Sequence, residues 1–487
     1  MKHASLSRRN FLAQSATVAV AAPFVAQTAF GQGSANDKLG VMVMGTGGRG
    51  NDHVNQMLSD PRTVVLYVCD ADEKRATDVA KKVADKQGFA PKAIRDMREA
   101  LGDGALDIVT CAAVNHWHTL CGIWALQAGK HVFLEKPICC SIHEGKAITA
   151  AAKKYSKICQ VGTQRRSNKA QTEAVKFVQE GGIGEVKLAR GICYKRRKSI
   201  GALGAYPIPA SVDYNLWCGP CPDDMPTRPT FHYDWHWQRK YGNGEIGNNG
   251  PHFNDMSRWF LGLERFPNSV FAYGGRVGYD IERKDPEYID AGDTPNTHVS
   301  VFDYGDRMIV MECRGLESPK ALNVDFGTII HGSAGYLTAE EGTCTAYDAT
   351  GKEIKRFTGA GNNFKDFIDA VEKNDQSLVK ADARCGALSA ALCHLGEIAF
   401  YAGEENKLPV TDIEKRVGNN AALHGIFKDT VAHLKLNGVD TNKTMLSISD
   451  VLKIDPVAER FTESEAANKL MKRSYRAGFV VPEPENV

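Results

Sequence analysis

Lys136 is the side chain with the clearest potential for proton chemistry. It stands in Glu135-Lys136-Pro137, directly after an apolar run over residues 130–134 that predicts a strand. A lysine made less basic by burial or by a nearby positive charge can hydrogen-bond a substrate hydroxyl or exchange a proton with it. The alternative is a solvated lysine that pairs with Glu135. The strand-end position favours the catalytic role.

His252 is the second candidate for handling a proton. Pro251 at a predicted helix start places His252 in the first turn, and Asp255, three residues later, shares its face. An imidazole oriented by a carboxylate is suited to removing a proton from a hydroxyl. The alternative is an amphipathic helix with an acidic residue near its start. We predict catalytic roles for His252 and Asp255.

A glycine-rich turn after the first apolar run predicts a nucleotide-binding site. Gly45, Gly47 and Gly50 have the spacing G-x-G-x-x-G, in which a tight turn, close approach to a pyrophosphate and close helix packing each exclude a Cβ. Asp70 ends the next apolar run, where a carboxylate binds the ribose hydroxyls of NAD and repels the 2′-phosphate of NADP. NADP stays open because two basic residues follow, Lys74 and Arg75. We predict that the turn binds the cofactor through Gly45, Thr46, Gly47, Gly48, Arg49 and Gly50.

Short apolar runs alternate with helical patterns over residues 39–161. The alternation predicts a doubly wound parallel sheet, in which ligands bind beyond the carboxyl ends of the strands. Asn115 and His118 follow one such strand, and Glu135 and Lys136 follow the next. We expect these four residues to bind the cofactor.

The pattern changes after residue 162. Long alternating segments predict antiparallel strands over residues 186–194, 269–275, 297–304 and 307–314. The fold class is therefore α/β, with an amino-terminal Rossmann domain and a carboxyl-terminal α/β domain that has an open, mainly antiparallel sheet. Residues 198–240 are rich in Pro, Gly, Trp and Tyr, which predicts either an ordered loop over the active site or a packing or oligomer-contact loop.

Charge and cysteine content narrow the classes of ligand. The 487 residues include 60 Lys and Arg against 58 Asp and Glu, so a nucleic-acid surface is not indicated and a small uncharged substrate fits better.

The 13 cysteines are odd in number, and many stand in apolar contexts typical of small buried hydrophobes. Cys218 and Cys221 form a C-x-x-C without two further ligands at matching spacing. They predict a local disulfide or two free thiols, and no metal site.

The first 31 residues predict an export signal. Paired arginines, Arg8 and Arg9, precede a moderately apolar stretch over residues 13–30, and no acidic residue occurs before Asp37. The alternative, a stable membrane span, is disfavoured because polar residues and a proline interrupt a stretch that would need about 20 mostly apolar residues. We expect twin-arginine export and a periplasmic protein.

Together these motifs resemble the glucose-fructose oxidoreductase and inositol dehydrogenase (Gfo/Idh/MocA) family. The resemblance rests on the glycine turn, Asp70, Asn115-His116-Trp117-His118 and the run that ends in Glu135-Lys136-Pro137, and it continues to the terminal Glu465 to Pro482. It is closest to exported members with a long carboxyl-terminal extension. The predicted parts are a signal (1–31), an NAD(P)-binding Rossmann domain (38–161), a substrate and oligomerisation domain (162–410) and a helical extension (411–487).

The resemblance also implies roles for single residues. In the family, the helix matching His252 carries an aspartate four positions earlier that acts with the lysine of Glu-Lys-Pro; this sequence has Asn248 there. The change leaves Lys136 and His252 as the proton-handling pair, with Glu245 or Asp255 as carboxylates that could substitute. We predict that the substrate is bound by Arg165, Asn248 and His252.

Three functions are compatible with these residues. We favour an NAD(P)-dependent oxidoreductase that transfers a hydride between nicotinamide and a hydroxyl carbon of a sugar, sugar derivative or polyol. The second is a glycosidase or lyase that oxidises a ring carbon transiently, although the expected Tyr-Pro-Thr-His-Gly-like segment is not found. The third is a noncatalytic sugar-binding protein with a structural nucleotide, which the intact Lys136 and His252 disfavour. The resemblance also implies a homo-oligomer, a dimer or tetramer.

Overall fold

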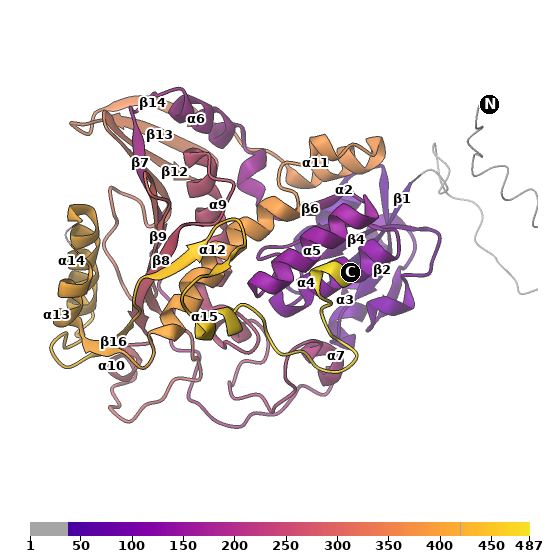
Figure 1. Ribbon diagram of the computed structural model, residues 1–487. Coiled ribbons are helices and arrows are strands. Elements are labelled where there is room, and N and C mark those ends of the chain that lie inside the picture. Colours follow the sequence, from indigo (N-terminus) through magenta and orange to yellow (C-terminus); the bar gives the residue numbers. More distant parts are fainter. Residues whose placement is uncertain (1–37, 419) are drawn as a thin grey trace, which may run out of the picture. The chain divides into compact units, whose positions relative to one another are not determined.

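Two β-sheets organise the chain (Figure 1). The computed structural model describes residues 38–418 and 420–487, and the predicted export signal lies outside them. Residues Leu39–Val487 form one compact unit, so the predicted boundaries at 161 and 410 stay predictions.

The first sheet is parallel and has six strands in the order β3-β2-β1-β4-β5-β6, which confirms the predicted Rossmann fold. The strand order reverses beside β1, the position at which ligands bind in such sheets. The strands are β1 (Leu39–Met44), β2 (Thr63–Cys69), β3 (Lys92–Ile94), β4 (Leu106–Cys111), β5 (His131–Leu134) and β6 (Cys159–Val161). The helices between them are α2 (Gly48–Ser59), α3 (Glu73–Gln87), α4 (His118–Gln127) and α5 (Ile142–Tyr155).

The second sheet is larger and mainly antiparallel, as predicted. Along its path β14-β13-β12-β11-β7-β10-β9-β8-β16-β15, the pair β7 and β10 is parallel. Its strands are β7 (Val186–Cys193), β8 (Ser269–Gly275), β9 (Thr297–Asp303), β10 (Met308–Arg314), β11 (Phe326–Gly332), β12 (Gly335–Glu340), β13 (Thr343–Asp348), β14 (Glu353–Thr358), β15 (Lys407–Pro409) and β16 (Met445–Ile448), with β17 (Leu452–Asp455) and β18 (Arg460–Phe461) attached beside β8. The remaining helices are α6 (Lys169–Gln179), α7 (Tyr214–Cys218), α8 (Gly244–Asn248), α9 (Gly250–Leu261), α10 (Tyr279–Arg283), α11 (Asn363–Lys373), α12 (Ala383–Ala402), α13 (Val410–Ile413), α14 (Ala421–Leu436) and α15 (Glu465–Lys469).

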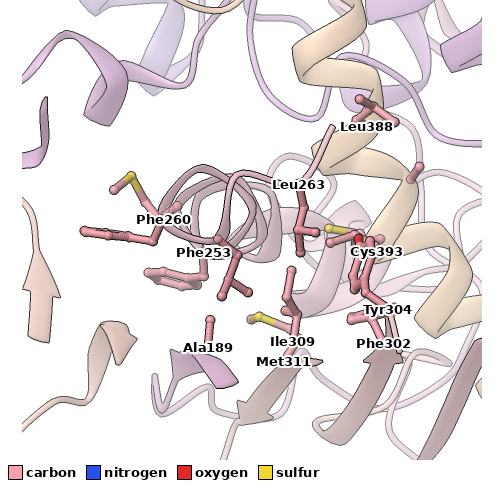
Figure 2. Packing of buried hydrophobic residues seen from close by; sticks show 14 of the residues in the cluster. Ala189, Phe253, Phe260, Leu263, Phe302, Tyr304, Ile309, Met311, Leu388 and Cys393 are labelled. Atoms are coloured by element: carbon pink, nitrogen blue, oxygen red, sulfur yellow. The ribbon is translucent and has the colours of Figure 1, made fainter. Parts of the chain in front are cut away.

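Both faces of this sheet bury side chains, because successive residues of a strand point to opposite faces. Phe302 and Met311 pack under α9 and α12, as Figure 2 shows, together with Phe253 of α9 and Cys393 of α12. Their strand neighbours, such as Val301, instead pack with α13 and α14. Helix α9, which carries His252, is therefore held between the sheet and α12.

The carboxyl-terminal extension corrects one prediction. Residues 411–487 are not simply helical: besides α14 and α15 they contain β16, β17 and β18, and β16 and β17 both pair with β8. Hydrogen bonding to an edge strand satisfies backbone groups that would otherwise stay unpaired, and this favours strands there.

Two further sequence expectations concern cysteines and membrane spans. Cys218 and Cys221 are buried free thiols, so of the two predicted states the structure has the second. Within residues 38–418 and 420–487 no group of His, Cys, Asp or Glu could hold a metal ion. In the same residues one helix, α12, has the length and apolarity of a membrane span, but 83% of that stretch is buried in protein, as expected of a core helix.

Candidate active site

A cavity of about 480 Å³ lies at the carboxyl ends of the first sheet's strands. Its wall also includes residues of α8, α9 and the loop over residues 198–240. Of the two roles predicted for this loop, the structure therefore supports the first, an ordered loop over the active site. The predicted residues on the wall are Gly45, Gly47, Gly48, Arg49, Asp70, Asn115, His118, Glu135, Lys136, Asn248 and His252.

The three glycines of the turn have different physical roles. A Cβ at Gly45, whose φ is +81°, would lie 2.3 Å from the Ala113 nitrogen, and one at Gly50 would lie 1.7 Å from the Gly45 oxygen. A Cβ at Gly47 would meet only the Arg75 guanidinium, at 3.1 Å. Gly45 and Gly50 are thus required by the protein's own packing, whereas Gly47 leaves space on the cavity wall.

That space adjoins a helix terminus suited to an anion. Gly47 is the N-cap of α2, no side chain caps it, and the first turn has no acidic residue. The free N–H groups and the helix dipole therefore favour a bound phosphate group. This arrangement fits the pyrophosphate of a dinucleotide.

Asp70 is held at the tip of β2 by the turn itself. Its Oδ2 accepts hydrogen bonds from the nitrogen and the hydroxyl of Thr46, each at 2.8 Å. Thr46 therefore acts by orienting this carboxylate. Arg75 and Arg95 line the same part of the cavity, each with a carboxylate nearby, at 3.7 Å from Asp72 and 3.9 Å from Glu73 respectively.

The residues after β4 support the next part of the wall. Asn115 is 5% exposed, and its Nδ2 has no hydrogen-bond partner among the described residues, so it is available to a ligand. The His118 ring lies between two carbonyl oxygens, with Nδ1 2.7 Å from that of Pro137 and Nε2 3.0 Å from that of Ala113. Burial lowers the pKa of His118. The ring connects the loops after β4 and β5 and so positions the segment that carries Lys136.

Glu135 is a buried carboxylate with several donors. Arg49 Nε donates to it at 2.6 Å, His53 Nε2 lies 3.3 Å away, and the Lys136 backbone nitrogen donates at 3.2 Å. Burial alone would raise the pKa of Glu135, but the His53 hydrogen bond and the Arg49 charge outweigh it and hold the pKa well below its usual range. Glu135 stays ionised, and it orders the base of the Lys136 loop.

Lys136 and His252 meet the same cavity from two different parts of the fold. Lys136 Nζ donates to the backbone oxygen of Asn248 at 2.6 Å, which connects the loop after β5 to the end of α8. Burial lowers the pKa of Lys136, opposed by the charge of Glu135. His252 Nδ1 has no partner among the described residues, and burial followed by the charges of Lys136 and Arg165 lowers the pKa of His252 well below its usual value. A neutral imidazole can accept a proton.

Asp255 does not join this pair, which corrects the sequence expectation. It is 1% exposed and accepts two hydrogen bonds from Arg166 Nε, at 3.0 and 2.9 Å, and one from the Ser389 hydroxyl at 2.8 Å. The helix turns Asp255 toward α12 and away from the cavity, so it has a structural role.

Glu245 and Arg165, two further candidates from the sequence, are also buried and engaged by other residues. Glu245 is 2% exposed and pairs with Arg197 at 2.9 Å, so it does not replace the missing carboxylate. Arg165 is 2% exposed, packs 5.1 Å above the Phe253 ring and is not on the cavity wall; its neighbour Gln164 is. Arg165 therefore does not contact a substrate in this cavity. Its charge instead helps to lower the pKa of His252.

Several wall residues were not predicted individually. They include Gln164, Lys195, Arg197, Tyr233, Trp235 and His236. The aromatic ones belong to the loop whose composition had indicated a cover, whereas Lys195 belongs to no motif.

The fold and the site define a class: a protein with a dinucleotide-binding Rossmann sheet whose strand ends share one cavity with the segment after β7, the loop over residues 198–240 and α9. Residues 39–163 match the model of the oxidoreductase family with an NAD-binding Rossmann fold. These residues are therefore similar to the NAD-binding Rossmann domain of the Gfo/Idh/MocA oxidoreductase family.

Relatives agree with that assignment. The chain is 26% identical to levoglucosan dehydrogenase of Pseudarthrobacter phenanthrenivorans over 40% of this chain and 43% of that protein. It is 33% identical to scyllo-inositol 2-dehydrogenase (NAD(+)) of Bacillus subtilis over 29% of this chain and 41% of that protein. The chain spans less than half the length of these curated relatives.

Solved structures extend the likeness of fold beyond residues 39–163. The WlbA dehydrogenase of Bordetella pertussis, in complex with NADH and UDP-GlcNAcA, aligns with a TM-score of 0.52 and 18% identity over 73% of this chain and 94% of that one. Aldose-aldose oxidoreductase of Caulobacter crescentus aligns with a TM-score of 0.52 and 16% identity over 72% and 94% of the two chains.

Proposed function

We propose that the protein is an NAD-dependent oxidoreductase acting on a hydroxyl carbon of a sugar, sugar derivative or polyol. The observation that carries the proposal is the position of Lys136, which lines the nucleotide cavity 2.6 Å from the backbone of α8, with His252 lining the same cavity from α9. Two groups of lowered pKa on one cavity are suited to proton transfer.

The residues divide the work between binding and proton transfer. The turn at Gly47 and the start of α2 bind the pyrophosphate, and Asp70 binds a ribose. NAD held by these residues would supply the acceptor for a hydride from the carbon that bears the hydroxyl. One of the two facing groups, Lys136 or His252, takes up the single proton of that hydroxyl, and His118 and Glu135 hold the Lys136 loop in place.

Net cofactor turnover tests this proposal. Purified protein is incubated with NAD and a panel of neutral sugars, sugar acids, polyols and glycosides, and NADH is measured together with the sugar products. We expect NADH to accumulate in equal amount to an oxidised sugar. Glycoside cleavage without net NADH would favour the transient-oxidation mechanism, and sugar binding without any chemistry would favour the noncatalytic alternative.

Export and assembly are further parts of the proposal. The paired arginines support export by the twin-arginine route, and replacing both, Arg8→Lys with Arg9→Lys, should keep the protein in the cytoplasm. Unchanged export in cell fractionation would contradict this.

The family resemblance supports a dimer or tetramer, which light scattering of the purified protein measures.

A further inference from the structure

The basic residues on the cavity wall are not all neutralised. Four of the six have a carboxylate within salt-bridge distance: Arg49 with Glu135, Arg75 with Asp72, Arg95 with Glu73 and Arg197 with Glu245. For Lys136 and Lys195 the described residues provide no such partner. Lys136 already has a role in the proposed chemistry. Lys195 is exposed, so water solvates its ammonium in the free protein and a ligand in the cavity can reach it.

Lys195 stands on the sheet side of the cavity. It lies two residues after β7, and its Nζ rests 5.4 Å from the centre of the Phe326 ring. That ring in turn packs edge-on against Phe253, at 4.8 Å, and Phe253 is the neighbour of His252 in α9. Lys195 thus belongs to the part of the wall formed by the second domain.

The charged groups that act on His252 are a second observation about charge in the cavity. Of the charged groups that shift the pKa of His252, Lys136, Arg165 and Arg49 lower it, and Glu135 raises it. Glu135 is itself paired with Arg49. One guanidinium nitrogen of Arg165, Nη1, is buried without a hydrogen-bond partner within the described parts of the chain. The charged groups that act on His252 are therefore mainly positive; of these, Lys136 and Arg49 are on the cavity wall, and Lys195 is not among the groups that shift the pKa of His252.

The acidic residues of the wall do not offset this excess. Asp70 is held by the glycine turn, and Asp96 pairs with Arg98 at 2.6 Å. Both belong to the nucleotide-binding domain at the ends of β2 and β3. An anionic ligand group near Lys195 would complete the pairing at the second domain.

We propose that the substrate of this oxidoreductase is an acidic sugar, such as a uronate or a uronic acid glycoside, whose carboxylate pairs with Lys195. The inference rests on the proposed function and narrows its substrate class. It also revises the expectation of an uncharged substrate, because the near-zero net charge of the whole chain does not describe the charge on one cavity wall. A charge-assisted hydrogen bond between an ammonium and a carboxylate supplies the selectivity.

Matched pairs of sugars that differ only at C6 test the proposal. D-glucuronate is compared with D-glucose, and D-galacturonate with D-galactose, by calorimetric binding to the NADH complex and by kcat/KM with NAD. We expect at least one acid to bind about tenfold or more tightly than its neutral partner, with the difference decreasing as salt increases. Equal or weaker binding of both acids would overturn the inference.

Variants of the lysine locate the effect. Lys195→Gln should weaken binding of that acid about tenfold and leave its neutral partner unchanged, while Lys198→Gln, at an exposed position outside the cavity wall, should change neither. If Lys195→Gln instead weakened NADH binding, the lysine would serve the cofactor's phosphates and the proposal would be wrong. Absence of NADH formation with every sugar would contradict the proposed function, while the binding comparison would still decide the charge preference.

Discussion

The two walls of the cavity are built by different rules. The Rossmann wall comes from successive strand ends of one parallel sheet, and its arginines, such as Arg49, pair with nearby carboxylates. The other wall combines the segment after β7, an irregular loop and α9, and there Lys195 has no carboxylate partner among the described residues. On the first wall the unpaired groups, Asn115 Nδ2 and the start of α2, face the cofactor, whereas on the second wall Lys195 is left for another ligand group.

Two ion pairs, one half-exposed and one buried, sharpen the contrast. Arg49 and Glu135 lie on the cavity wall beside Lys136, whereas Arg166 and Asp255 lie off it although Asp255 is only three residues from His252. The first pair orders a loop with proposed chemistry. The second pair connects α9 to the segment that carries Arg166. A charged residue close in sequence to a catalytic candidate therefore need not share its function.

The largest expected effect comes from removing the proton-handling group of the Rossmann wall. Lys136→Ala should lower kcat by about 10²–10⁴-fold, the usual contribution of a positioned acid or base. NADH affinity, measured by fluorescence titration, should stay close to that of the wild type. Lys153→Ala, at an exposed position on α5, is the control and should keep full activity. A kcat within threefold of wild type would remove Lys136 from the mechanism.

The second prediction separates chemistry from stability on α9. His252→Ala should lower kcat by about 10²–10⁴-fold with little change in unfolding. Asp255→Asn should cost about 3–5 kcal/mol in free energy of unfolding, because Arg166 would be left buried without its partner. Denaturant unfolding and kcat are measured on both variants. A stable Asp255→Asn protein with greatly reduced kcat would show that Asp255 takes part in the reaction.

The third prediction concerns the nucleotide end of the Rossmann wall. Asp70→Ser removes the carboxylate that disfavours a 2′-phosphate, while Arg75 and Arg95 remain on the wall. The preference for NAD over NADP should fall about tenfold, measured as the ratio of kcat/KM values. An unchanged ratio would mean that Asp70 does not face the ribose.

The smallest effect is expected in the pH profile. Sugar oxidation should increase with pH as Lys136 loses its proton, with a midpoint below the ordinary lysine pKa of about 10.4. The charge of Glu135 raises the pKa of Lys136, so Glu135→Gln should move the midpoint to lower pH. Profiles of kcat/KM for wild type and variant measure this shift. Movement to higher pH would contradict the assigned coupling.

Much of the Rossmann wall could be predicted from the sequence. The spacing of Gly45, Gly47 and Gly50 requires a turn, and parallel strands bring their carboxyl ends to one edge, so Asn115 and Lys136 had to converge there. Such rules act over a few residues or one strand–helix unit. The parallel, doubly wound form of the first sheet and its NAD-binding site followed from them.

Other features depended on the tertiary structure. The sequence shows that Asn248 replaces an expected carboxylate, but only the fold shows that its backbone oxygen, rather than its side chain, contacts Lys136. Likewise, the separation of Asp255 from His252 follows from the competing partner Arg166, 89 positions away in the chain. Lys195 belongs to no sequence motif. Its proposed role rests on its place on the cavity wall, where no carboxylate of the described residues lies within salt-bridge distance. Charge pairing across distant segments depends on how the domains pack, and residue spacing does not encode it.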